Sequence, residues 1–99
     1  MMAILEQIRL LVVSGRVIYS YHSVTEKLSE INKLRNLNLT KSDIVSVILK
    51  GEMVDVFDND ERGRRYAIQG LALDDVTVLE IVCRIEDNLV IITVYEPYF

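Results

Sequence analysis

The sequence predicts an α+β fold in which N-terminal helices pack on one face of a four-stranded antiparallel sheet. Apolar residues recur at helical spacing up to Gly51, and beyond it they alternate with a period of two. Short polar segments separate the alternating stretches, as is typical of hairpin turns. The 99 residues suffice for one domain, with a helical part over 1–51 and a sheet over 52–96.

The first two helices are predicted from amphipathic spacing and capping residues. Residues 2–14 form one apolar stripe that ends at a Ser-Gly pair. Residues 17–19 are β-prone and form a short connector. The second helix begins near Ser20 or Ser23, because Ser23 opens a capping-box pattern and Ser20 is an alternative cap.

The third helix has the clearest local signals. Thr40 is a good N-cap, and Asp43 lies where a negative charge favours the positive end of a helix. Lys50 and Gly51 supply the signals of a C-terminus. A helix is therefore expected between Thr40 and Gly51.

Four strands follow, over residues 52–58, 64–72, 76–85 and 89–96. Their short connections predict that neighbouring strands pair as hairpins, and Pro97 ends the last one. The residues expected to face the helices are Leu79, Ile81, Cys83, Val90, Ile92 and Val94.

Composition excludes several classes of protein. The chain is 51% hydrophobic and 26% charged, which is typical of a globular domain. Cys83 is the only cysteine, so an intrachain disulfide and a CxxC metal cluster are excluded. Glu6 and Arg9 interrupt the first apolar stretch, so we do not expect it to be a signal peptide. No run approaches the ~18 apolar residues that a membrane span needs. A cytoplasmic location without membrane association is expected.

Charge is unevenly distributed along the chain. The net charge of −4 combines +3 over residues 1–51 with −7 over residues 52–99. An acidic half argues against broad, non-specific binding of nucleic acid, although a small basic site remains compatible with it. It also suits a basic protein partner.

Strand alternation places a polar set on the sheet face away from the helices: Arg65, Gln69, Glu80, Arg84, Thr93 and Tyr95. One interpretation is a solvated face with an ion pair between Arg84 and Glu80. The other is a site for a phosphodiester, where arginines neutralise oxyanions and Glu80 or Tyr95 moves protons.

Two further features are candidates for chemistry. His22 is the only histidine, and near a helix start its neutral imidazole could act as a general base, although a structural role is the simpler reading. Arg62, Arg64 and Arg65 form a basic cluster that is either a solvated turn or a phosphate clamp. Neither a metal site nor a cofactor is expected.

Four segments together resemble the domain-of-unknown-function family 4258 (DUF4258): IRLLVVSGRVIYSYHSVTEKL, LTKSDIVSVILKGEMVDVF, RGRRYAIQG and LVIITVYEPYF. The four segments in this order are fairly specific to the family when taken together, whereas no single segment is specific to it. That family resembles the MqsR, BrnT and RelE group of bacterial toxins. The resemblance implies RNA cleavage without metal and neutralisation by an antitoxin encoded alongside. It implies functional positions at His22, Arg65, Thr93 and Tyr95.

The chain departs from the family pattern at two positions. Many relatives carry histidine where this chain has Glu80, and arginine where it has Lys27. Glu80 can still act as a general base.

Two hypotheses follow. In the first, the protein is a toxin-type endoribonuclease: Glu80 or His22 takes the proton of a ribose 2′-hydroxyl, Arg65 and Arg84 stabilise charge, and Tyr95 orients the phosphate or protonates the leaving oxygen. The second is a non-catalytic interaction module, or inactive toxin homologue, that binds a basic partner through the acidic hairpins, with Asp55, Asp58, Asp60 and Glu61. If the site residues converge in one concavity, the enzyme hypothesis is favoured. If they pair with one another on a flat surface, the interaction-module hypothesis is favoured. Formation of a homo-oligomer is left open.

Overall fold

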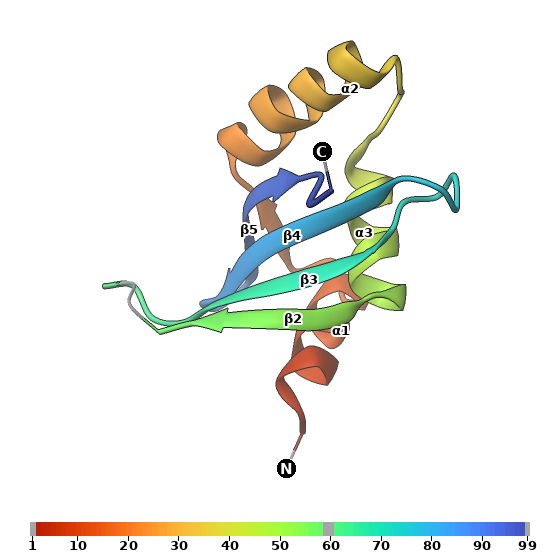
Figure 1. The fold of residues 1–99 in the computed structure, drawn as a ribbon. Helices are drawn as coiled ribbons and strands as arrows, with labels where there is room; N and C mark the ends of the chain where they lie inside the picture. The colour runs from red at the N-terminus through yellow and green to blue at the C-terminus, as the bar shows by residue number, and fades with distance from the viewer. Residues whose placement is uncertain (1, 59–60, 99) are drawn as a thin grey trace.

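The computed structural model describes residues 2–58 and 61–98 (Figure 1). Its helical segments are α1 (Ile4–Val13), the π-helical η1 (His22–Leu28), α2 (Ser29–Arg35) and α3 (Lys41–Lys50). Its strands are β1 (Val17–Tyr19), β2 (Glu52–Phe57), β3 (Arg65–Leu71), β4 (Val78–Ile85) and β5 (Leu89–Tyr95). The α+β class, the helices and the four predicted strands are therefore confirmed, with ends shifted by a residue or two.

The sheet has five strands in the order β1-β5-β4-β3-β2, so the prediction of a four-stranded antiparallel sheet is wrong. Residues 17–19 are not merely a connector, because they pair in parallel with β5, from Val17 opposite Leu89 to Tyr19 opposite Ile91. The other three pairings are antiparallel, as predicted. The sheet therefore includes a strand from residues 1–51, the predicted helical part of the chain.

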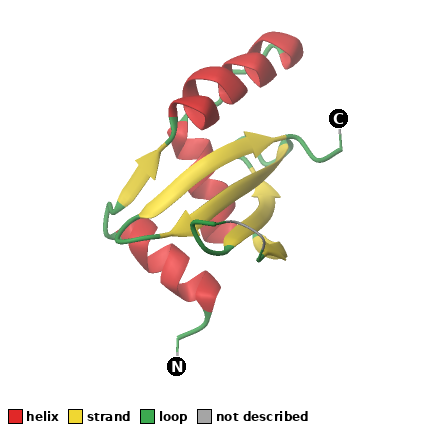
Figure 2. Cartoon of the chain, turned by 90° about the vertical axis from the view of Figure 1, so that its left-hand side faces the viewer, coloured by secondary structure: helices red, strands yellow, loops and turns green. Residues whose placement is uncertain are grey.

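The helices α1 and α3 pack on one face of this sheet and leave the other face open (Figures 1 and 2). The segment η1–α2 lies at the β5 end of the sheet, with η1 alongside β5. The segment η1–α2 therefore borders the sheet at its β5 end only.

Capping determines both ends of α3. Thr40 and Asp43 form a capping box, in which the Thr40 backbone N–H donates to Asp43 Oδ2 at 2.7 Å. Gly51 follows the helix, and its backbone lies so close to Gln69 that a side chain would collide with β3. The predicted start and end of this helix are confirmed.

The second helix begins at the alternative cap. Ser20 Oγ accepts a hydrogen bond from the backbone N–H of Ser23 at 3.0 Å, while Ser23 itself is buried inside η1. The expected capping box at Ser23 is therefore wrong. The helix then continues from η1 into α2 and ends at Asn36, whose φ of 52° is left-handed.

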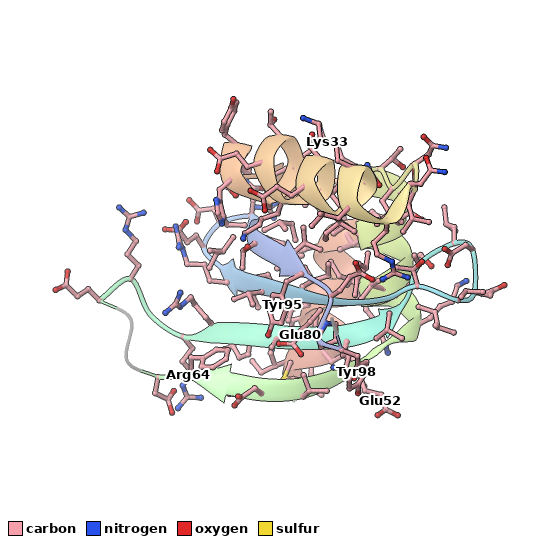
Figure 3. The ribbon with its side chains drawn as sticks, turned by 45° about the horizontal axis from the view of Figure 1, so that its top comes forward. Lys33, Glu52, Arg64, Glu80, Tyr95 and Tyr98 are labelled. Atoms are coloured by element: carbon pink, nitrogen blue, oxygen red, sulfur yellow. The ribbon has the colours of Figure 1, made fainter. Side chains whose placement is uncertain are left out.

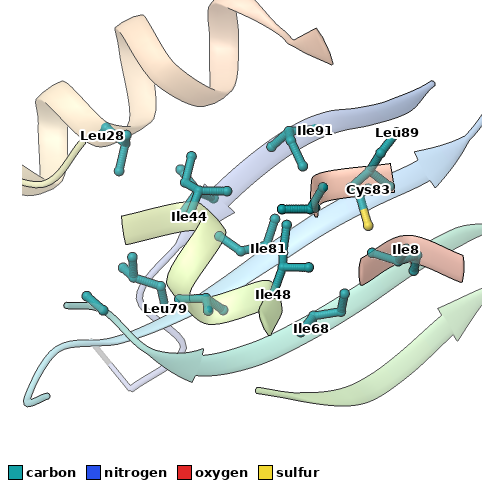
Figure 4. Packing of buried hydrophobic residues seen from close by; sticks show 14 of the residues in the cluster. Ile8, Leu28, Ile44, Ile48, Ile68, Leu79, Ile81, Cys83, Leu89 and Ile91 are labelled. Atoms are coloured by element: carbon teal, nitrogen blue, oxygen red, sulfur yellow. The ribbon is translucent and has the colours of Figure 1, made fainter. Parts of the chain in front are cut away.

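The core lies between the helical segments α1, η1–α2 and α3 and the inner face of the sheet (Figure 4). Leu79, Ile81, Cys83 and Val94 are fully buried there, as predicted. Val90 and Ile92 are not: they are only partly buried, and Leu89 and Ile91 occupy the core instead. The cause is a β-bulge, because Val82 pairs with Thr93 and Cys83 with Ile91, which leaves Ile92 as an extra residue on β5.

No helix in the described ranges 2–58 and 61–98 is both long and apolar enough to cross a membrane.

Candidate functional site on the open sheet face

One row of polar residues crosses the open face of the sheet. Gln69 on β3 pairs with Glu80 on β4, and Glu80 pairs with Tyr95 on β5. Directly paired residues on neighbouring strands have their side chains on the same face. The three side chains therefore stand side by side, as predicted from alternation.

These side chains form a connected chain of hydrogen bonds. Figure 3 labels three of its members, Glu80, Tyr95 and Tyr98. The Tyr95 phenol donates to Glu80 Oε2, and Gln69 Nε2 donates to Glu80 Oε1 at 3.2 Å. Tyr98, which follows the last strand, donates from its hydroxyl to Gln69 Oε1 at 3.1 Å. Because each carboxylate oxygen can accept more than one hydrogen bond, Glu80 keeps acceptor capacity beyond these two donors.

Glu80 is nearly buried although it lies on the open face. Its exposed fraction is 8%, whereas Tyr95 is 38% exposed. A carboxylate this enclosed needs hydrogen-bond donors to offset its lost hydration, and Gln69 and Tyr95 supply them. The expected ion pair between Arg84 and Glu80 is not among these contacts, since Arg84 pairs elsewhere.

The neighbouring row holds Ala67, Val82 and Thr93 and is flanked by Arg65 at the start of β3. A shallow hollow of about 220 Å³ is lined there by Phe57, Arg65, Val82 and Thr93. The hollow combines a guanidinium and a hydroxyl with an apolar floor. These are groups that can hold a phosphate and its ribose.

Arg84 lies on the same face, with a side chain that is 12% exposed. Its Nε is 3.3 Å from Glu86 Oε2, which places the two in ion-pair contact at the end of β4. Sequence reasoning missed Glu86 as a partner. It lies in the turn after the strand, where alternation says nothing about direction.

His22 contacts a carboxylate of its own helical segment. Its Nδ1 is 3.2 Å from Glu26 Oε2 on the same helical segment, and both side chains are half exposed. Among the residues that the structure describes, His22 makes no hydrogen bond or ion pair with Glu80 or Tyr95, so its catalytic role stays a prediction.

The predicted phosphate clamp lies in the hairpin between β2 and β3. Arg62 and Arg64 are exposed, and Arg64 Nε pairs with Asp58 Oδ1 at 2.7 Å (Figure 3). Arg65 instead belongs to β3 and the open face. Of the acidic residues proposed for partner binding, Asp60 lies outside the described residues.

Two features of the site were not predicted from the sequence. Tyr98 comes after Pro97, beyond the last alternating stretch, so no period assigned it a face. The second is a hollow between α2 and the end of β5, which Tyr95 helps to line. It depends on the packing of a helix against a strand more than fifty residues away in the sequence, which no local pattern reveals.

In chemical terms, the open face combines a carboxylate, a phenol, an amide, a hydroxyl and two guanidinium groups. Glu80, Tyr95 and Gln69 pair with one another, while Arg65 and Thr93 line a separate hollow. The residues thus share one face and adjacent rows, but they do not converge in a single deep pocket. Among the described residues, no three His, Cys, Asp or Glu side chains are placed to hold a metal ion.

The chain matches no curated protein and no solved structure, but it matches one model of a protein family. The family model described as "Domain of unknown function (DUF4258)" matches residues 31–96, which run from α2 to the end of β5. The match includes strands β2 to β5 and excludes β1, His22 and Tyr98. Because it spans about two thirds of the sequence, the chain belongs to the DUF4258 family.

Proposed function

We propose that the open sheet face binds single-stranded RNA and cleaves it without a metal ion, as a toxin-type endoribonuclease. The observation that carries this proposal is the hydrogen bond from Tyr95 to Glu80, with Arg65 and Arg84 on the same face. A carboxylate and a phenol in contact form an acid–base pair, and the arginines supply positive charge beside it.

The reaction follows from these groups. Glu80 takes the proton of a ribose 2′-hydroxyl, and the 2′ oxygen attacks the adjacent phosphorus as the bond from phosphorus to the 5′ oxygen breaks. Tyr95 gives its proton to the departing 5′ oxygen and regains one from Glu80 through their hydrogen bond. The products are a 2′,3′-cyclic phosphate and a 5′-hydroxyl, and both enzyme groups return to their starting state.

The remaining residues position and stabilise. Arg65 and Arg84 offset the charge that develops on the phosphorane oxygens, and Thr93 donates to a phosphate beside Arg65. Gln69, fixed by Tyr98, holds Glu80 in place. Each proton-transfer or charge-stabilising role is worth on the order of 10²–10⁴ in rate.

Specificity and control would come from partners. With a net charge of −4, the protein binds bulk RNA weakly, so its target is set by context such as the ribosome. The resemblance to the MqsR, BrnT and RelE toxins supports an antitoxin as partner. A basic docking segment on that antitoxin would complement the acidic hairpin residues Asp55, Asp58 and Glu61.

Two observations favour the alternative, a non-catalytic interaction module or inactive toxin homologue that uses the acidic hairpins. The first is that the polar residues do not converge in one concavity, because Glu80 pairs with Gln69 and Tyr95 while Arg65 and Thr93 line a separate hollow. The second is that two of the arginines pair with carboxylates of the chain, Arg84 with Glu86 and Arg64 with Asp58. A surface whose arginines are neutralised within the chain has less charge to offer a phosphate.

The test is RNA cleavage in the presence of EDTA, together with growth after induced expression of the protein alone. Glu80→Gln, Tyr95→Phe and Arg65→Ala should each lower cleavage by 10²-fold or more, on the order expected for such roles. Lys50→Ala, which removes an exposed cation from α3, is the matched control and should cleave as the wild type does. If wild type and variants alike neither cleave RNA nor impair growth, the interaction module is the better account.

A further inference from the structure

We infer that the hollow between α2 and the end of β5 is a subsite for one nucleobase of the bound RNA, an inference that rests on the proposed function. The hollow has a volume of about 410 Å³. Binding sites for small molecules have volumes of roughly this size and upward. Its apolar lining residues are Ile31 and Leu34 from α2 and Val94 and Tyr95 from β5. Leu34 and Tyr95 are exposed there, whereas Ile31 and Val94 are buried.

The charges around this hollow neutralise each other. Lys27 Nζ lies 3.6 Å from Glu30 Oε2, and Arg35 forms an ion pair with Glu96. Two cations and two carboxylates leave no net charge for a phosphate to seek. The hollow therefore suits a neutral, flat group better than an anion, and a nucleobase is such a group.

An exposed leucine marks the rim. Leu34 has an exposed fraction of 85%, although it borders a concave apolar surface. Leu28 and Ile31, on the same helical segment, are buried in the core, so Leu34 is not needed there. A base stacked between Leu34 and the Tyr95 ring would cover both side chains.

Tyr95 links this hollow to the cleavage site. Tyr95 is one of the residues that line the hollow, and its hydroxyl donates to Glu80 on the open face. Figure 3 shows the Tyr95 and Glu80 side chains next to each other. A nucleotide whose sugar lies at Glu80 would have its base within reach of α2. The geometry thus gives phosphate and base separate places, with the arginines on the sheet for one and the α2–β5 hollow for the other.

The experiment separates base from phosphate by titrating ¹⁵N-labelled protein with two probes. Adenosine has a base and no phosphate, and ribose 5-phosphate has a phosphate and no base. Adenosine should shift the amide signals of Leu34, Val94 and Glu96, whereas ribose 5-phosphate should shift those of Arg65 and Thr93. If adenosine shifts no signal of α2 or of the end of β5, the subsite is refuted.

A matched pair of variants supplies the second arm. Leu34→Ala should weaken adenosine binding about fivefold, the factor that corresponds to part of one leucine side chain leaving water. Leu10→Ala removes an equally apolar, 54% exposed side chain from α1 and should leave that affinity unchanged. Equal affinities for the two variants would overturn the inference.

The outcomes also separate this inference from the proposed function. Adenosine bound at Leu34 without any RNA cleavage by the wild type would keep the subsite and remove the ribonuclease. RNA cleavage that proceeds equally in wild type and Leu34→Ala, with no adenosine binding, would keep the ribonuclease and remove the subsite.

Discussion

Tyr95 lies directly opposite Glu80 in the β4–β5 ladder, and its phenol donates a hydrogen bond to Glu80 Oε2. The β-bulge at Ile92 makes this contact possible. Leu89 and Ile91 point into the core, so an unbroken alternation would carry Tyr95 inward as well. The extra residue reverses the alternation, and Tyr95 reaches the open face.

The contact between Tyr95 and Glu80 should contribute to stability, because a hydrogen bond to a charged, nearly buried carboxylate is among the stronger ones. Tyr95→Phe should lower the free energy of unfolding in urea by about 1–3 kcal/mol. Tyr98→Phe is the control: its hydroxyl binds the neutral Gln69, and its side chain is 72% exposed. A larger loss for Tyr98→Phe than for Tyr95→Phe would contradict the geometry, and a double-mutant cycle with Glu80→Gln measures the coupling directly.

Much of this fold follows from local patterns in the sequence. The capping box at Thr40 and Asp43 and the change of period at Gly51 are local features, and the structure confirms what they predict. The predictions of a four-stranded sheet and of an inward-facing Val90 and Ile92 are wrong for the same reason. The parallel pairing of Val17–Tyr19 with β5 and the bulge at Ile92 both depend on segments far away in the chain.

The candidate site, too, was predicted only in part: the face on which residues lie was predicted, but their partners were not. Alternation placed Arg65, Glu80 and Tyr95 on one face, because β3 and β4 are regular and the bulge precedes Tyr95. It could not show which partner each charge takes. Arg84 pairs with Glu86 in a turn, and a turn has no period from which a direction can be read.

Gly51 should tolerate no side chain, because the end of α3 packs against the backbone of β3. A Cβ added there would overlap the carbonyl oxygen of Gln69 and lie 2.9 Å from its carbonyl carbon. Gly51→Ala should therefore lower the free energy of unfolding by about 3 kcal/mol, at the upper end for overpacking. Gly15→Ala meets open space and pays only for a φ of 73°, about 1 kcal/mol. Thermal or urea unfolding compares the two, and equal losses would show that α3 does not approach β3 this closely.

Cys83 should make stability fall at alkaline pH. Burial raises the pKa of its thiol to about 12, from 9.0 for an exposed cysteine. The folded protein keeps this proton while the unfolded chain loses it, so the free energy of unfolding declines as pH rises above 9 and continues to decline until about 12. At pH 10 the loss is about 1.4 kcal/mol relative to Cys83→Val, which has no proton to release. Urea midpoints for both proteins at pH 8 and pH 10 provide the measurement, and parallel shifts would show that Cys83 is accessible to water.

Glu86 should compete with RNA for Arg84, since its Oε2 lies 3.3 Å from the guanidinium Nε. Glu86→Gln removes that competitor and should tighten binding of single-stranded RNA about two- to fivefold at low salt, the range that corresponds to a surface ion pair. The gain should shrink as salt rises, because phosphate contacts are screened.

Asp87→Asn is the matched control: it changes the net charge by the same amount in the same turn, but Arg84 pairs with Glu86. If both variants tighten binding equally, the gain comes from overall charge, and Arg84 does not contact the RNA. Filter binding or fluorescence anisotropy at two salt concentrations separates the two outcomes.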